Sequence, residues 1–259
     1  MTLYDMMMNP DVPMEDIVVR QTLLGGSYPL NTGDSGSYKA SYNEEKARMT
    51  PMFYAYVQDQ HQSNYGGSVG ALKAMGALEM GVPEEELQPL VSMWREANPN
   101  ITAYWWKIDA AAKSVIRDHV PEEIGLVRFE YRGGMMFIRL PSGRSLAYVK
   151  PKICENQFGG EGISYYGMTP QKKFERIETY GPKLVENITQ AISRDILAHS
   201  MQTLRKERIV GHVHDEIILE AEKDASVQDI CEQMGRTPAW ISGLVLRADG
   251  YECDYYQKD

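Results

Sequence analysis

The chain has 259 residues, of which 43% are hydrophobic, a length and composition typical of a globular protein with a buried core. No segment reaches the roughly 18 consecutive apolar residues of a membrane helix, and residues 1–10 lack the basic start and apolar block of a secretory signal. Three dispersed cysteines without a CxxC pair disfavour a disulfide framework or a zinc site and indicate a reducing, cytoplasmic setting.

The formal net charge is −9, which by itself disfavours a nucleic-acid-binding protein because such proteins usually carry a basic surface. The charge is unevenly distributed along the chain. Residues 126–183 contain ten Lys and Arg against five Asp and Glu, whereas residues 220–259 contain four against nine. A basic middle beside an acidic end fits a protein that contacts phosphates on one face, and fits ordinary variation of surface charge equally well.

The first half of the chain has helical patterns. Residues 1–63 contain turn and loop residues without a clear period, so no fold is predicted there. A helix is predicted over 71–80, ended by Gly81. A second is predicted over 84–97, with acidic residues in its first turn. Apolar residues then recur at three- and four-residue steps over 101–115, which predicts a third, amphipathic helix.

The pattern changes to strands after residue 121. Short β-like runs over 127–131, 135–140 and 146–149 are separated by Gly-rich turns, which predicts an antiparallel meander. Residues 157–169, rich in Gly and Tyr, are predicted to form a loop.

A long helix is predicted over 183–204, followed by a hairpin over 209–220 and a helix near 226–234. The long helix has an apolar stripe and a separate polar stripe, formed by Asn187, Gln190 and Arg194. Helices first and an antiparallel sheet later predict an α+β fold.

The hairpin carries charged residues at its tip. Hairpins this tight favour Asn-Gly or Asp-Gly at the turn, but His214, Asp215 and Glu216 stand here between apolar strands. A tip that departs from turn preferences indicates a function other than folding. Two adjacent carboxylates repel each other, and a divalent cation would offset that repulsion. Hard carboxylate oxygens favour Mg²⁺, although solvated turn residues would give the same tripeptide.

The segment His212–Glu220, with the sequence His-Val-His-Asp-Glu-Ile-Ile-Leu-Glu, resembles motif C of family A DNA polymerases. The resemblance covers about 64–259. Further motifs follow in the order found in bacteriophage-type members of the family, over residues 65–72, 98–106, 140–144, 176–197 and 246–253.

The resemblance implies the C-terminal fingers and palm portion of such an enzyme. The expected α+β fold has a helical fingers remnant followed by an antiparallel-sheet polymerase palm. The implied organisation is a divergent, unassigned segment over 1–63, a helical fingers portion over 64–120 and a palm with the metal-binding hairpin over 121–259.

The family's reaction is template-directed nucleotidyl transfer from deoxynucleoside triphosphates to primer–template DNA, by a two-metal-ion mechanism with Mg²⁺. The resemblance implies that Asp215 is a metal ligand and catalytic residue and that Glu216 is an auxiliary catalytic carboxylate. The DNA-contacting residues that it implies are His214 at the primer terminus, Asn187 and Gln190 at the minor-groove edge of the new base pair, and Tyr65 with Gly66 at the end of the fingers helix.

The chain departs from the family in its first part. The family places an arginine and a lysine on the fingers helix where this chain has Phe53 and Val57, and its second metal-binding aspartate has no counterpart between residues 1 and 64. We therefore expect an active site to need residues supplied outside this chain, for example by a second polypeptide, and the isolated chain to polymerise poorly.

Two other functions remain open from the sequence. One is a non-catalytic fragment that binds primer–template DNA through the basic middle of the chain. The other is a metal-dependent hydrolase that uses His212, His214 and Asp215 as ligands, since alternate residues of a strand point to the same side. A hydrolase would need further ligands, and a metal titration would separate it, because histidines favour Zn²⁺.

Overall fold

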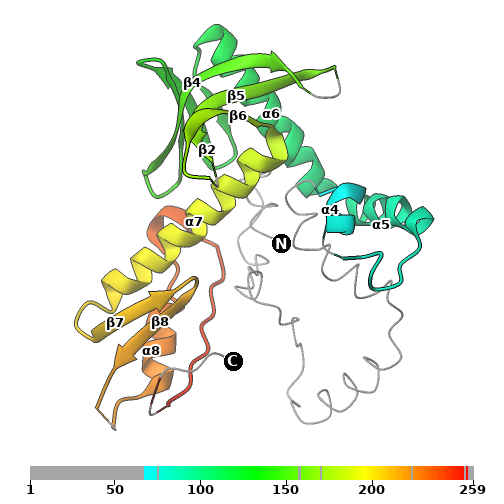
Figure 1. The fold of residues 1–259 in the computed structure, drawn as a ribbon. Coiled ribbons are helices and arrows are strands. Elements are labelled where there is room, and N and C mark those ends of the chain that lie inside the picture. Colours follow the sequence, from blue (N-terminus) through cyan, green and yellow to red (C-terminus); the bar gives the residue numbers. More distant parts are fainter. Residues whose placement is uncertain are drawn as a thin grey trace. The chain divides into compact units, whose positions relative to one another are not determined.

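The computed structural model describes residues 67–74, 76–156, 159–169, 171–222, 224–253 and 255 (Figure 1). The described residues up to Trp106 belong to one compact unit, and those from Lys107 onward belong to another. None of the helices in these ranges is both long and apolar enough to cross a bilayer.

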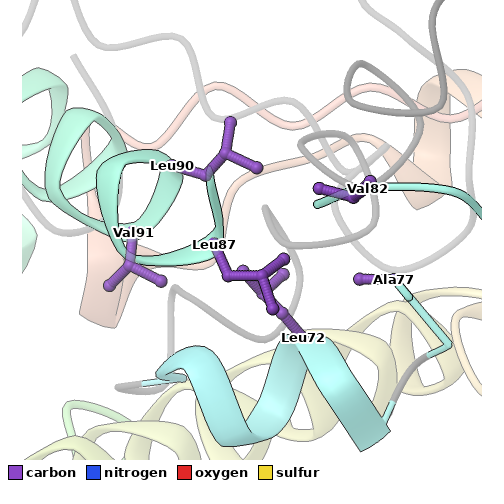
Figure 2. Close-up of a cluster of buried hydrophobic side chains, with 6 residues drawn as sticks. All are labelled: Leu72, Ala77, Val82, Leu87, Leu90 and Val91. Carbon is purple, nitrogen blue, oxygen red and sulfur yellow. The ribbon is translucent and has the colours of Figure 1, made fainter. Parts of the chain in front are cut away.

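The first unit is helical and contains α4 (Val69–Ala74), α5 (Glu84–Ala97) and the start of α6 (Pro99–Asp118). The predicted helix over 84–97 is confirmed, with its acidic first turn. Side chains of α4, α5 and the connection between them form a hydrophobic cluster (Figure 2), whose buried members are Leu72, Ala77, Val82, Leu87, Leu90 and Val91.

The predicted helix over 71–80 is wrong in extent, because α4 already ends at Ala74. Gly76 has a φ of 86°, and Ala77 N donates to Leu72 O while Gly76 N donates to Lys73 O, which is the Schellman pattern of a helix end. Gly81, with a φ of 85°, closes a second, separate turn in the same manner. The apolar period continues across this break because side chains before and after it pack into the same hydrophobic cluster.

Helix α6 confirms the predicted amphipathic helix and extends it to Pro99–Asp118. The six residues that carry the apolar period are all buried, namely Ile101, Tyr104, Trp105, Ile108, Ala112 and Val115. Within the first unit, the ring of Trp105 stacks on that of Trp94 with centroids 5.9 Å apart.

The second unit contains a six-stranded antiparallel sheet in chain order. Its strands are β1 (Glu122–Ile124), β2 (Val127–Arg132), β3 (Met135–Arg139), β4 (Ser145–Glu155), β5 (Glu161–Met168) and β6 (Phe174–Thr179). The predicted meander is confirmed for β2, β3 and β4, and the turn between β2 and β3 falls at Gly133 and Gly134, both with positive φ.

The prediction of a loop over 157–169 is wrong, because β5 occupies most of it. Strand β5 pairs with β4 on one side and with β6, which was not predicted, on the other. Glycine weakens a strand only modestly, and hydrogen bonds on both edges outweigh that local preference.

Helix α7 (Gly181–Thr203) confirms the predicted long helix and buries its apolar stripe. Its N-cap residue makes no side-chain cap; instead the buried carboxylate of Asp109 on α6 accepts from Gly181 N at 2.8 Å. This bond satisfies one of the N–H groups that a helix leaves unpaired at its start, and it ties α7 to α6.

The chain continues into a two-stranded sheet of β7 (Arg208–Val213) and β8 (Glu216–Glu220), then α8 (Val227–Met234) and a short 3₁₀ helix (Ala239–Ile241). The predicted helix near 226–234 is confirmed, and the Ser226 hydroxyl caps it by accepting from Asp229 N. Helices followed by antiparallel sheet confirm the α+β class.

Candidate functional site

The hairpin of β7 and β8 has a two-residue tip. Val213 pairs with Glu216 in the antiparallel register, so His214 and Asp215 make the turn. The hairpin predicted over 209–220 is confirmed. His214 and Glu216 are exposed and Asp215 is partly buried, so two consecutive acidic residues stand at the end of the two-stranded sheet.

His214 has a φ of 49°, whereas Asp215 has no positive φ. A positive φ at only the first turn position is the pattern of a type II′ turn, where glycine is preferred. For an L-residue such as histidine, the left-handed region costs roughly 1–2 kcal/mol. The imidazole is therefore kept at the tip at the expense of local stability, and strain of this kind is concentrated at functional positions.

The argument that His212 and His214 share one side of a strand is wrong for this structure. His212 lies in β7, but His214 lies in the turn with a left-handed φ, so strand alternation does not relate the two side chains. Across the described ranges, no three His, Cys, Asp or Glu side chains come together as a metal site. Among the described residues, His212, His214 and Asp215 therefore do not form a metal site together.

A second feature is an open hollow of about 390 Å³ between α7 and the neighbouring strands. Among the described residues, its lining includes two arginines and no acidic residue. The lining residues are Arg144, Leu146, Ala147, Tyr148, Tyr165, Asn187, Gln190, Ala191 and Arg194. The structure thus brings the predicted Asn187 and Gln190 to one concave surface, together with Arg194 and with Arg144, whose charge is paired with Asp195.

Asn187 is held in place by a tyrosine at the base of this hollow. Its Nδ2 donates to the hydroxyl oxygen of Tyr148 at 3.0 Å. Burial raises the pKa of Tyr148, although the bond from Asn187 opposes the shift. Tyr165 meets Tyr148 edge to face at 4.9 Å between centroids, and burial raises its pKa too, while nearby Lys183 lowers it.

Arg144, which also lines the hollow, is held by hydrogen bonds to α7. Its Nε donates to Asp195 Oδ1 at 2.6 Å and its Nη2 to Ala191 O at 2.9 Å, so the guanidinium is anchored on α7. The Ser142 hydroxyl donates to Asp195 Oδ2 at 2.5 Å. Gln190 Nε2 donates to Glu186 Oε1 at 3.3 Å along the helix.

Sequence reasoning did not assign a role to several residues of this hollow. Arg194 was visible in the polar stripe of α7, and Arg144 ends the motif over 140–144. Tyr148 gave no signal because an aromatic residue is ordinary in a strand, and Tyr165 gave none because it fell in the segment predicted to be a loop. Tyr65 and Gly66, expected at the end of the fingers helix, lie outside the described residues.

No family model and no solved structure matches the chain. A curated relative, described as a DNA polymerase of Bacillus phage SP02, is 44% identical over 201 residues. The chain is similar to part of a phage DNA polymerase. The match covers 75% of this chain but 31% of the relative, so the chain spans about a third of the protein it resembles.

Proposed function

We propose that this chain carries the catalytic hairpin of a family A DNA polymerase, which extends a primer strand on a DNA template with deoxynucleoside triphosphates. The observation that supports this most is the 44% identity to the phage DNA polymerase over 75% of the chain. The strained hairpin tip supports it independently, because a histidine and two carboxylates are displayed where a glycine turn would be more stable.

In this proposal Asp215 is a ligand of Mg²⁺, Glu216 is an auxiliary carboxylate and His214 holds the primer terminus. Mg²⁺ favours oxygen ligands and usually combines one or two carboxylates with substrate phosphates and waters. The remaining carboxylate comes from outside the described residues. Either another part of the same protein or a second polypeptide supplies this carboxylate, and the experiment below distinguishes the two sources.

The hollow along α7 is proposed to bind the primer–template duplex. Minor-groove edges of all base pairs present acceptors in similar places, so amide donors there suit an enzyme that reads every sequence. Asn187 and Gln190 supply such amides, and each NH₂ group has two hydrogens, of which one is already engaged. In this proposal Arg194, which lines the same surface, contacts the phosphate backbone, whereas Arg144 is paired with Asp195 and helps to shape the hollow.

The decisive experiment compares Asp215→Asn with the matched control Asp224→Asn, which removes a charge from an exposed acid outside the hairpin. Primer extension is measured with Mg²⁺ and all four nucleotides, for the chain alone and with a polypeptide that carries the family's second aspartate motif. We expect Asp215→Asn to abolish extension and to leave the Kd for primer–template DNA unchanged, because the substitution keeps the shape of the side chain.

Extension only in the presence of the added polypeptide would identify the second source of the carboxylate. Extension by Asp215→Asn at the rate of Asp224→Asn would refute the catalytic role. DNA binding with no extension under either condition would instead favour the non-catalytic binding fragment.

The duplex proposal is tested separately with Gln190→Ala. Loss of one hydrogen bond, worth about 0.5–1.5 kcal/mol, is expected to raise the Kd for primer–template DNA roughly 2- to 12-fold. The increase should be the same for AT-rich and GC-rich duplexes. A change confined to one base composition would contradict minor-groove contact through shared acceptors.

A further inference from the structure

The outer face of the β5–β6 hairpin exposes a row of large side chains. Tyr166, Met168 and Phe174 are 36%, 64% and 62% exposed, although all three lie in regular strands. Tyr166 is opposite Arg176 in the register and Met168 is opposite Phe174, so the four side chains share one face. We call this surface the aromatic face.

The aromatic face is ordered by one arginine. The Arg176 guanidinium lies over the Tyr166 ring at 4.5 Å, and its Nη1 donates to the Ser164 hydroxyl at 3.0 Å. Its Nη2 donates to the carbonyl oxygen of Lys150 at 3.3 Å. The ring of Phe174 then stacks on Tyr166, with centroids 6.0 Å apart and planes 22° from parallel. The rings are therefore held in a fixed arrangement with part of their surface open to solvent.

Four lysines lie in the strand and the turn next to the aromatic face, and one exposed acid, Glu178, shares the side of β6 that carries Phe174 and Arg176. The four lysines near it, Lys150, Lys152, Lys172 and Lys173, are all exposed. Lys150 and Lys172 have φ values of 45° and 59°, in the left-handed region that glycine occupies at lower cost. Lysine is thus kept at two positions where the backbone disfavours it, in a chain whose net charge is −9.

The aromatic face is separate from the hollow along α7. Side chains alternate across a strand, so Tyr165, which lines the hollow, points to the opposite side of β5 from Tyr166. Ile177, paired with Tyr165, is on that same inner side. A ligand of the aromatic face would therefore not compete directly for the residues that line the hollow.

We propose that the aromatic face binds an unpaired DNA strand, with bases stacked on Tyr166 and Phe174 and phosphates beside the lysines. Single strands are held by aromatic rings on which bases stack and by cationic side chains along the backbone. The ordered, half-open rings provide the first element and the neighbouring lysines provide the second. Binding at this face needs neither metal nor nucleotide, so it goes beyond the reaction proposed for the hairpin.

The test measures fluorescence anisotropy with an oligothymidine of about 20 nucleotides, longer than the usual site of one binding module, and with a blunt duplex. EDTA is present so that catalysis plays no part. The variant Tyr166→Ala/Phe174→Ala should raise the Kd for the oligothymidine at least tenfold, which corresponds to about 1.4 kcal/mol, with a smaller effect on the duplex. The variant Tyr166→Trp/Phe174→Tyr should bind the oligothymidine about as tightly as the unchanged protein, because it keeps an aromatic ring at both positions.

The lysines are tested by salt dependence. Each phosphate contact to a single strand contributes about 0.7 to the slope of log K against log salt, so Lys172→Ala/Lys173→Ala should lower that slope by about 1.4. The matched control is Arg236→Ala/Arg247→Ala, which removes the same charge from exposed residues elsewhere in the second unit. Its slope should stay near that of the unchanged protein.

The proposal is overturned if the double aromatic variant, shown to be folded by thermal denaturation, binds the oligothymidine within twofold of the unchanged protein. It is also overturned if the control lowers the salt slope as much as the lysine variant. A change in oligomeric state with no change in DNA affinity would identify the aromatic face as a protein interface instead.

Discussion

Replacing the histidine at the hairpin tip should make the protein more stable and less active. His214 has a φ of 49° at the first position of a two-residue turn. Glycine adopts this conformation without the clash between Cβ and the following carbonyl oxygen. His214→Gly therefore removes local strain, and it also removes the imidazole that the proposed function assigns to the primer terminus.

The size of the stability gain follows from two opposing terms. Relief of the left-handed conformation is worth roughly 1–2 kcal/mol, and the greater freedom of glycine in the unfolded chain costs about 0.5–1 kcal/mol. The difference lies between about 0 and 1.5 kcal/mol, and its midpoint of about 0.75 kcal/mol would raise Tm by roughly 1.5–3 °C for a unit of about 150 residues. His214 is exposed, so little packing is lost in exchange.

The assay is urea denaturation followed by circular dichroism, together with primer extension under the conditions that support it. Lys172→Gly is the matched control for stability, because Lys172 has a φ of 59° and is also exposed. His119→Gly should gain less, since His119 has a φ of 57° but stacks on Tyr131 at 3.9 Å.

A free energy of unfolding that falls in His214→Gly while it rises in Lys172→Gly would refute the reasoning. That result would mean that the imidazole makes stabilising contacts that outweigh the strain. Unchanged extension by a more stable His214→Gly would leave the strain argument intact and would remove His214 from the proposed site.

Two further predictions concern the frame that positions the site. Asp109→Ala should lower the free energy of unfolding by about 1.5–3 kcal/mol, the usual contribution of a hydrogen bond to a charged group, because it removes the buried partner of Gly181 N. The control is Asp118→Ala, which replaces an exposed acid on the same helix. It should change the free energy of unfolding by less than about 0.5 kcal/mol. Burial raises the pKa of Tyr148, so the folded protein keeps this proton at a pH where the unfolded chain loses it, and stability should fall as pH rises above about 10. Tyr148→Phe should lessen that fall above about pH 10 in urea denaturation, and an identical alkaline loss in both proteins would contradict it.

Local patterns accounted for much of the helical structure. The span of α5 was predicted to the residue, because acidic residues mark its start and the Asn-Pro sequence marks its end. The α6 period appeared in the sequence because all six of its apolar residues are buried. The error at α4 has a local cause as well, since Gly76 interrupts the helix without interrupting the apolar period.

The strands and the hollow depended on residues far apart in the chain. Strand β5 was missed because its glycines and tyrosines match a loop when they are considered alone, and only its pairing with β4 and β6 makes it a strand. The hollow combines Arg144, Tyr165 and Arg194 from separate elements, so no short window of sequence contains it.

The sequence by itself determined the hairpin, its His-Asp-Glu tip and its resemblance to a polymerase motif, because these depend on neighbouring residues and on alternation along one short segment. The tertiary structure alone decided three other features. It gave His214 a left-handed conformation, brought Arg144 beside the polar stripe of α7 in one hollow, and turned Tyr166 and Phe174 away from that hollow. The first feature depends on how the turn closes the two paired strands. The other two depend on strand register and on helix packing, which bring together groups that the sequence keeps tens of residues apart.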